Sequence, residues 1–487
     1  MSLSARIEAL TRTAAPQDEA ARGELERIRS RLREPLRVAI AGRVKAGKST
    51  LLNALVGQRL AASDAGECTR IVTWYRDGLT YDVTAMLREG GSQPVLFRRD
   101  DGRLEIELGA LRPEQVRRLE VTWPSARLAG MTLIDTPGLD GMDTEAEGRT
   151  RALFGLAEGE VGEVDAVIYL MRHAHASDAA FLESFRDASV AKPSPANAVA
   201  ALSRADEIGS ARADALSAAA TVAERYARDP RLRALCAGIV PVAGLLAEAG
   251  ATLRESEVAV LRAIVALPSA QQDDLLLSAD RFANRYAPVA SEARAALLRR
   301  LGLFGVRWSV AQIREGHAQT AQELATSLVA VSGIRRLIEM IDENFARRSE
   351  LLRARMAISS LKRLARAAST HAPGRAFHAE LERLEASAPE LTLLGLLDFV
   401  LSGVLDLTDS EHEEVLRVAR IGDAATRLGA PAGDRSTMRE IANERIEYWR
   451  QRGFDPIATG SMREAADALV RSYEGLLVEA STDQPAT

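Results

Sequence analysis

The chain has 487 residues, of which 47% are hydrophobic and 27% charged, a composition typical of about two or three folded domains and not of a disordered or fibrous protein. Its net charge of −5 provides no general attraction to nucleic acid, so we expect no nucleic-acid partner. The two cysteines, Cys68 and Cys236, lie far apart, which indicates a reducing cytoplasm and neither a disulfide nor a zinc site. The first residues lack a signal-peptide core and no segment has the roughly 20 apolar residues of a membrane span, so any membrane contact should be peripheral.

The first predicted element is an amphipathic helix. Leu25, Ile28 and Leu32 follow Ala21 at helical spacing, and Pro35 ends the pattern. Short apolar runs then alternate with helical stretches, at residues 37–41, 71–75, 131–135, 166–170, 198–203 and 239–242. This alternation predicts an α/β domain with a doubly wound, mostly parallel sheet. A turn signal at residues 99–102 indicates an added antiparallel edge.

After about Leu245 the sequence predicts only helices, and therefore an all-α second domain. One long helix should begin after Gly333 and leave the first domain, while the last helix should open with Ser461 and Glu464 in capping-box spacing. The helices at the two ends of the chain each carry an apolar stripe that needs a partner. We expect them to pack against each other and against the long middle helix.

Residues 42–49, GRVKAGKS, match the P-loop pattern, follow a predicted strand and open a helix that Gly57 closes. The glycines let backbone N–H groups turn toward phosphate oxygens, and Lys48 should reach the β and γ phosphates. The hydroxyl of Ser49 should bind Mg²⁺. The predicted nucleotide-binding residues of this loop are Gly42, Lys45, Ala46, Gly47, Lys48, Ser49 and Thr50.

Two further segments are expected around the terminal phosphate. Asp135 to Gly138, DTPG, follows an apolar run, which should bring the acid to the outer shell of the metal and the glycine N–H to the γ-phosphate. Thr69 lies in a loop before the run 71–75 and should complete the Mg²⁺ shell and hold the attacking water through its carbonyl. The alternative for residues 135–138 is an ordinary turn, and the alternative for Thr69 is a loop threonine without a role in the site.

The base should be guanine. Residues 198–202 run into Ser203, Arg204 and Asp206, a segment similar to the Asn/Thr-Lys-x-Asp motif of GTPases with two positions changed. The Asp206 carboxylate can accept from guanine N1–H and the 2-amino group, whereas adenine has no donor at N1, and Arg204 can stack on the base. The alternative for Asp206 is a helix N-cap. The strand end at residues 241–244 is expected to add a backbone contact to the base.

Together these motifs resemble those of the bacterial dynamin-like GTPases, most closely the actinobacterial isoniazid-inducible dynamin-like proteins. The resemblance rests on residues 42–55 (GRVKAGKSTLLNAL), 67–75 (ECTRIVTWY), 135–138, 203–209 (SRADEIG) and 332–364. It implies GTP hydrolysis with Mg²⁺ and nucleotide-dependent pairing of GTPase domains, with a second copy or a related dynamin-like protein. It also implies a neck made from both chain ends and the middle helix, and a stalk that remodels membrane from the cytoplasmic face. The expected divisions are a neck helix at 1–35, a GTPase domain at 36–333, a neck and stalk at 334–480 and a disordered tail at 481–487.

The chain departs from the dynamin pattern in two places. Dynamins usually carry Gln and Ser where this chain has Val44 and Lys45, and the serine helps to bind a monovalent cation that offsets transition-state charge. We therefore hypothesise that Lys45 supplies this charge in cis, like an arginine finger; the alternative is a solvent-facing lysine. Leu139 stands where many small GTPases carry a catalytic Gln, so Thr69 and dimer formation would have to position the water.

Two segments are candidates for membrane contact. In residues 391–407 a broad apolar face accompanies Asp398, Ser402 and Asp406 at helical spacing, which predicts either a buried stalk helix or the membrane-touching tip. The second is the apolar run 301–310. Beside a mechanochemical GTPase, two alternatives remain: a regulatory GTPase acting on a protein partner without membrane remodelling, and a membrane scaffold whose nucleotide site only controls assembly.

Overall fold

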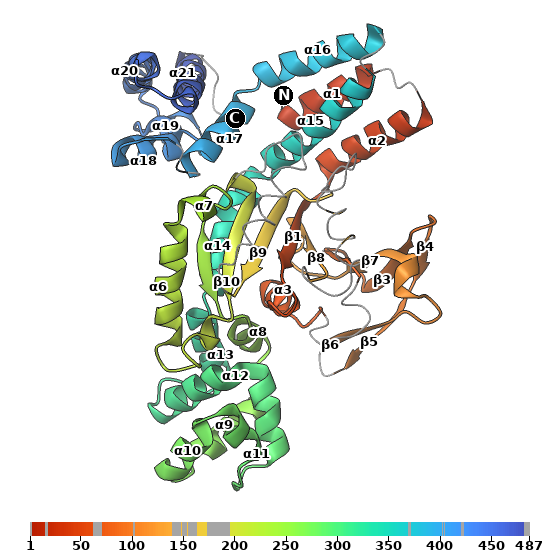
Figure 1. The fold of residues 1–487 in the computed structure, drawn as a ribbon, viewed down its shortest axis with the longest axis vertical. Helices are drawn as coiled ribbons and strands as arrows, with labels where there is room; N and C mark the ends of the chain where they lie inside the picture. Colours follow the sequence, from red (N-terminus) through yellow and green to blue (C-terminus); the bar gives the residue numbers. More distant parts are fainter. Residues whose placement is uncertain are drawn as a thin grey trace.

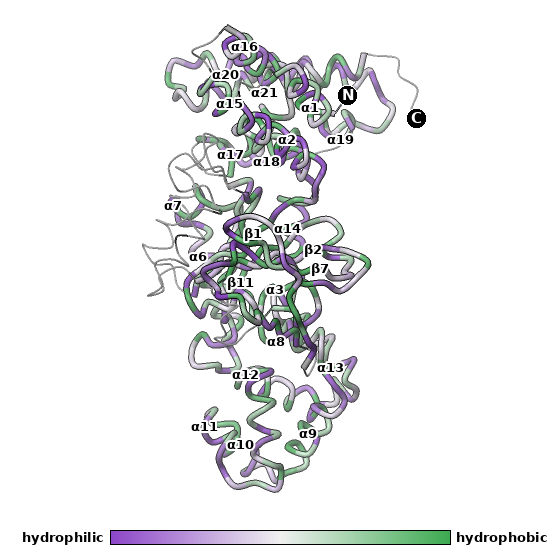
Figure 2. Tube along the Cα trace, turned by 90° about the vertical axis from the view of Figure 1, so that its right-hand side faces the viewer, coloured by the Kyte–Doolittle hydropathy of each residue, from purple (hydrophilic) through white to green (hydrophobic). Residues whose placement is uncertain are grey.

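The computed structural model describes residues 2–14, 18–61, 71–100, 103–138, 148, 153, 163–172, 195–368, 372–401, 403, 405–419 and 423–481. The molecule is elongated, with an α/β domain in the middle, a helical extension at one end and two helical bundles at the other (Figures 1 and 2). None of the helices in these ranges combines the length and apolar character that a membrane crossing needs.

The central sheet has the strand order β11-β10-β9-β1-β8-β2-β7-β3-β4. Strands β11, β10, β9, β1 and β8 run parallel, β2 pairs antiparallel with β8, and β3 and β4 form an antiparallel edge. The predicted mostly parallel fold is therefore confirmed. Its strands are β1 Leu36–Gly42, β2 Thr73–Arg76, β3 Asp82–Leu87, β4 Ser92–Pro94, β7 Val116–Thr122, β8 Met131–Asp135, β9 Ala166–Met171, β10 Ala198–Ser203 and β11 Ile239–Val242. The turn signal at 99–102 marks a separate hairpin, β5 Leu96–Asp100 with β6 Arg103–Glu107, and not the sheet edge.

Helices cover both faces of this sheet because successive side chains of each buried strand point in opposite directions. Val38 and Ile40 of β1 pack on the face covered by α3 (Lys48–Val56), α8 (Gly244–Thr252) and α14 (Ile334–Asn344). Ala39 and Ala41 face the opposite layer, formed by α6 (Ala215–Ala227) and α7 (Pro230–Arg233). The P-loop strand is thus fixed between two cores.

The predicted long helix after Gly333 is broken. Helix α14 ends at Asn344, the turn Ala346–Arg348 follows, and α15 covers Ser349–Ala367. The stripe of α14, which includes Leu337, Ile341 and Phe345, is buried against the sheet domain, whereas the stripe of α15 faces the N-terminal helices. A single straight helix could not turn its apolar stripe toward both the sheet domain and the N-terminal helices. We therefore propose that the boundary between the domains lies at residues 346–348 and not at 333.

The first bundle, called the neck bundle here, contains α1 Leu3–Thr13, α2 Glu19–Arg33, α15 and α16 Ala372–Ala386. The predicted stripe of α2, Leu25, Ile28 and Leu32, is buried with Ile358 and Leu361 of α15. The single neck helix expected at residues 1–35 is two helices, because α1 ends at Thr13 and α2 begins at Glu19. The partner surface of α1 is also α15.

The second bundle, the C-terminal bundle, contains α17 Pro389–Leu401, α18 Asp409–Val418, α19 Ala424–Leu428, α20 Arg435–Phe454 and α21 Gly460–Ser481. The predicted stripe of α21, including Leu469 and Tyr473, is buried against α20 and α17 and not against the neck bundle. The expectation that the two ends of the chain pack together is therefore wrong, because α20 precedes α21 by one short loop and offers an antiparallel partner at once. The predicted cap is also wrong: Thr459 Oγ accepts from the Met462 N–H at 3.2 Å.

A buried carboxylate joins the helices of the C-terminal bundle. Glu414 accepts from Arg445 Nε (2.8 Å), Trp449 Nε1 (2.9 Å) and the Tyr473 hydroxyl (2.5 Å). We expect Glu414→Ala to lower the free energy of unfolding of this bundle by about 3 kcal/mol, because it leaves the half-buried Arg445 cation and the buried Tyr473 hydroxyl without this partner. Urea unfolding followed by circular dichroism measures the change. Glu474→Ala, which removes only an exposed pair with Arg450, is the control and should cost less than about 1 kcal/mol; equal effects would contradict the prediction.

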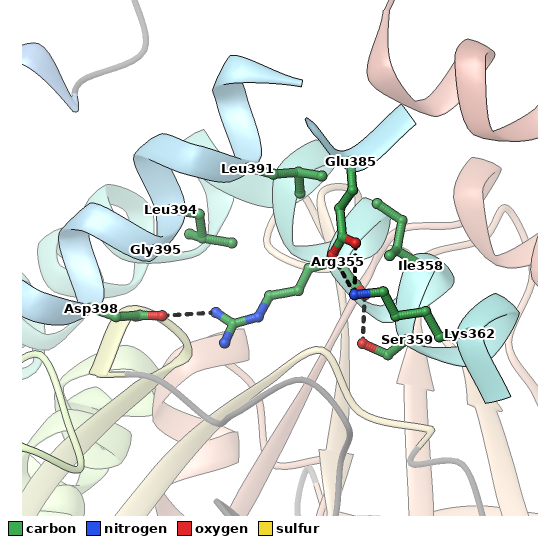
Figure 3. A pocket seen from close by; sticks show the side chains of 9 residues that line it. All are labelled: Arg355, Ile358, Ser359, Lys362, Glu385, Leu391, Leu394, Gly395 and Asp398. Carbon is green, nitrogen blue, oxygen red and sulfur yellow. Dashed lines mark hydrogen bonds and ion pairs between the residues drawn. The ribbon is translucent and has the colours of Figure 1, made fainter. Parts of the chain in front are cut away.

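Both sequence candidates for membrane contact are buried. Leu394, Leu397 and Val400 of α17 lie in protein cores, and Asp398 pairs with Arg355 of α15 at 3.2 Å. Figure 3 shows this pair beside a cavity of about 190 Å³ that lies between α15, α16 and α17. Of the two alternatives for residues 391–407, the structure therefore supports the buried helix. The run 301–310 is likewise core, within α12 (Ser291–Arg314) of the helical extension.

Candidate functional site

The P-loop joins β1 to α3, as the motif predicted. Gly42 has φ 150°, and a Cβ there would lie 2.5 Å from the Leu170 carbonyl oxygen, so only glycine fits. Lys45 and Gly47 have left-handed φ values of 62° and 94°, which bend the chain into the loop before the helix begins. Gly57, with φ 76°, closes α3 and donates its N–H to the Asn53 carbonyl.

Lys48 lies inside this loop. Its side chain is buried, and Nζ donates to the carbonyl oxygens of Gly42 (3.0 Å) and Arg43 (3.1 Å). Burial lowers the pKa of Lys48, and the nearby Asp135 carboxylate acts in the opposite direction. The loop thus holds an ammonium group where backbone N–H groups and a helix N-terminus also converge, which is an arrangement for phosphate.

Ser49 and Asp135, both predicted to lie near the metal ion, are hydrogen-bonded to each other. The Ser49 hydroxyl donates to Asp135 Oδ2 at 2.8 Å, and β8 places Asp135 beside Ile40 of the P-loop strand. Burial raises the pKa of Asp135, and its Oδ1 has no hydrogen-bond partner in the described part of the chain. A hydroxyl, a carboxylate and an unsatisfied buried oxygen fit Mg²⁺, which prefers oxygen ligands and retains several waters.

The segment after Asp135 passes directly over the P-loop. A Cβ on Gly138 would lie 2.5 Å from Val44 Cγ2 and 2.8 Å from Val44 Cα, so glycine is required at this crossing. The Thr136 hydroxyl donates to the Ile40 carbonyl at 2.9 Å and fixes the segment to β1. Thr136 lies inside the predicted motif but was not singled out from the sequence.

A pocket of about 100 Å³ continues from the P-loop toward the base motif. Asp206, which is 4% exposed, lines it, and burial together with Glu207 raises its pKa to about 6. It lies in the turn Ala205–Glu207, and the N-cap position of the next helix, α6, is occupied by Asp214, so the alternative that Asp206 is the N-cap is wrong. The other residues lining the pocket are Ala46, Gly47, Thr50, Leu51, Leu170, Ala201, Ser203, Arg204, Glu207, Val242, Gly244 and Leu245.

The base motif and the P-loop are bonded to each other. The Arg204 guanidinium donates to the Lys45 carbonyl (3.1 Å) and to Glu207 Oε1 (2.7 Å), and Ser203 Oγ donates to the Met171 carbonyl (3.2 Å). The link between Arg204 and Lys45 was not predicted, since nothing in either segment signals it. The Lys45 side chain itself is exposed, and its catalytic role stays a prediction.

If Asp206 binds guanine as predicted, its raised pKa should make that binding depend on pH. Only the carboxylate can accept both guanine donors, so protonation competes with binding, and GDP affinity should fall about tenfold per pH unit below pH 6 and be constant above about pH 7. Calorimetric titration between about pH 5 and pH 8 measures this. An affinity of the wild type that does not change over this range would contradict the prediction, and Asp206→Asn, which cannot titrate, is the control.

Thr69 and Leu139 lie outside the described residues. The predicted site residues within the described part, Gly42, Lys45, Ala46, Gly47, Lys48, Ser49, Thr50, Asp135, Gly138, Ser203, Arg204 and Asp206, surround one continuous region from the P-loop to the base pocket.

Comparison with known proteins finds similar sequences and structures. Residues 38–189 match a family model described as the Dynamin family. The isoniazid-induced protein IniC of Mycobacterium tuberculosis is 38% identical over 465 residues, covering 94% of this chain and 93% of that protein. The bacterial dynamin-like protein of Nostoc punctiforme is 32% identical over 152 residues, covering 28% of this chain and 20% of that protein. A solved structure described as an oligomerised bacterial dynamin pair aligns over 98% of this chain and 72% of its own, with 14% identity and a TM-score of 0.32.

Proposed function

This chain belongs to the dynamin family, as a bacterial dynamin-like protein, and on that premise we propose that it binds GTP with Mg²⁺ and hydrolyses it to GDP and phosphate. The observation that carries the proposal is the buried Asp206 carboxylate, which lines a pocket that opens on the P-loop. A carboxylate at the base end and an ammonium at the phosphate end suit a guanine nucleotide bound between them.

The residues of the site have separate roles in this proposal. Lys48 binds the β and γ phosphates, and the Gly138 N–H binds the γ-phosphate. Ser49 and Thr69 would hold Mg²⁺, with Asp135 in its outer shell, and the ion would offset charge on the phosphates. Thr69 also orients the attacking water through its carbonyl.

The base preference has a direct test. Asp206→Asn should lower kcat/KM for GTP by about a hundredfold, because an amide cannot accept from both guanine donors. It should gain activity with XTP, since xanthine carries an acceptor oxygen in place of the 2-amino group. Asp214→Asn, a change at an exposed helix cap outside the pocket, is the matched control. Unchanged GTP activity of Asp206→Asn would refute the role of Asp206.

We also propose that GTP drives pairing of the GTPase domain with a second copy or a related dynamin-like protein, and that the protein remodels membrane from the cytoplasmic face as a peripheral protein. Family membership supports this proposal. The surface of the C-terminal bundle is consistent with it, because Phe454, the last residue of α20, and Ile457, in the loop before α21, are 86% and 90% exposed. Exposed large apolar side chains three residues apart at one end of the bundle are suited to enter a lipid interface.

Liposome co-sedimentation tests the membrane contact. With GTP, the wild type should sediment with anionic liposomes, and the double variant Phe454→Ser and Ile457→Ser should remain mostly in the supernatant. Tyr286→Ser is the control, because Tyr286 is 97% exposed but lies on the helical extension at the other end of the molecule. A wild type that never sediments would instead favour the regulatory GTPase without membrane remodelling.

A further inference from the structure

The helical extension lies directly beside the base pocket. It includes α9 Glu255–Val265, α10 Ser269–Leu276, α11 Ala279–Asn284 and α12, and it lies at the end of the molecule opposite the bundles (Figure 1). Its hydrophobic core continues into α8 of the α/β domain through Leu246 and Ala249. Helix α12 also packs against the turn Ala205–Glu207 that carries Asp206. The extension therefore contacts the segment that would recognise the base.

The base-recognition segment, residues 204–211, has a strained backbone. Arg204, Ser210 and Ala211 have φ values of 53°, 64° and 57°, in the left-handed region that residues other than glycine rarely adopt. Such conformations persist only where the surrounding structure holds them, and they cluster at functional sites. Something outside this segment must therefore fix it.

Arg307 of α12 makes that connection. Its Nη1 donates to the Ala211 carbonyl at 2.6 Å, while Nε and Nη2 donate to the carbonyls of Leu276 (2.8 Å) and Leu277 (2.9 Å). One planar guanidinium thus ties the end of the strained segment to the C-terminal end of α10. Arginine suits this role because it presents several donors in a fixed plane.

Gly302 places the backbone of α12 against the Asp206 carboxylate. It interrupts the helix with φ 65° and ψ 173°, a conformation accessible essentially only to glycine. A Cβ at this position would lie 3.4 Å from Asp206 Oδ2 and 3.7 Å from Leu245 Cδ1. A methyl group there would be in ordinary van der Waals contact with the carboxylate, so a substitution acts mainly by straining the backbone that lies against Asp206.

We propose that Gly302 and Arg307 are positioning residues for base selection, through which the helical extension holds Asp206 at the angle that accepts both donors of guanine. This inference rests on the proposed GTP binding. It predicts that weakening either contact reduces the preference for guanine over hypoxanthine, which lacks the 2-amino group, and affects phosphate binding far less.

The first test compares two arginines of the same helix. Arg294 also donates to three backbone carbonyls, those of Val289, Phe282 and Arg285, but it closes a loop away from the pocket. Competition binding gives the ratio of the IDP to the GDP dissociation constant for each variant. We expect Arg307→Gln to raise the dissociation constant of GDP about tenfold or more and to bring the ratio close to one. The reason is that the hydrogen bond from the guanine 2-amino group to the Asp206 carboxylate is lost or misaligned. Arg294→Gln should leave the ratio of the wild type unchanged, although Arg294 is the more buried residue.

The second test uses two glycines and applies even if an arginine variant fails to fold, which circular dichroism would reveal. Gly302→Ala should reduce the ratio of the IDP to the GDP dissociation constant. Gly316→Ala should not, because it changes a left-handed position where the added Cβ would meet only the Gln319 amide, at 3.9 Å. If the wild type prefers GDP to ADP but Arg307→Gln and Gly302→Ala keep the wild-type ratio, this inference is overturned and the proposed function stands. If the wild type shows no preference for GDP over ADP, the proposed function itself fails.

Discussion

Lys48→Ala is expected to lower the affinity for Mg²⁺·GDP and Mg²⁺·GTP by about a thousandfold, the equivalent of about 4 kcal/mol for the loss of one buried charge partner. The ammonium lies inside the P-loop, bonded to two carbonyls, and it is the cation that the structure places among the phosphate-binding groups. Arginine should not replace it, because a planar guanidinium has a different shape from the compact ammonium that the Gly42 and Arg43 carbonyls bind.

Isothermal titration of the wild type, Lys48→Ala and Lys48→Arg measures this effect. The fold should survive, since the buried ammonium is desolvated in the free protein and removing it costs little there, and thermal unfolding checks that point. An alanine variant that binds GDP within about tenfold of the wild type would show that the phosphates lie elsewhere.

Lys45→Ala is expected to lower kcat for GTP hydrolysis by about a thousandfold and to change GTP affinity only slightly, if Lys45 supplies the charge that an arginine finger provides in other GTPases. Its backbone has a left-handed φ, and its carbonyl is held by Arg204, so the residue is fixed at the mouth of the loop while its side chain stays exposed. A residue in this place can contribute to the transition state without contributing to ground-state binding.

The cation dependence separates this role from a solvent-facing lysine. Wild-type hydrolysis should be independent of K⁺, whereas Lys45→Ser should be slow in Na⁺-free, K⁺-free buffer and be partly restored by K⁺. Lys45→Arg should retain part of the activity because it keeps the charge. Hydrolysis by Lys45→Ala at the wild-type rate would refute the hypothesis.

The sequence predicted the central features of the α/β domain because their signals are local. The strands at residues 198–203 and 239–242 appeared as apolar runs with turn residues at both ends, and their observed bounds agree. The P-loop was recognisable since its glycines and Lys48 occupy fixed positions in one short segment. These patterns depend on neighbours in the sequence and not on the arrangement of distant elements.

The arrangement of the helices was harder to predict. An apolar stripe shows that a helix has a partner but does not identify it, so α21 was assigned to the N-terminal helix although α20 covers it. The continuous pattern across residues 334–364 concealed the break before α15, because both stripes have the same period.

The candidate site shows the same limit. Asp206 was found by its motif, whereas Gly302 and Arg307 lie about a hundred residues further along the chain and reach the base-recognition segment only through tertiary packing. Sequence alone gives no reason to connect a glycine inside an apolar helix with the choice of a base.

The most direct test of the account is the ratio of kcat/KM for GTP to that for ATP, measured on the full chain with Mg²⁺. Because the buried Asp206 carboxylate can accept from guanine and meets only an acceptor at adenine N1, we expect GTP to be preferred by about a hundredfold or more. Equal hydrolysis of ATP and GTP, or a preference for ATP, would contradict the assignment of this pocket and with it the proposed function.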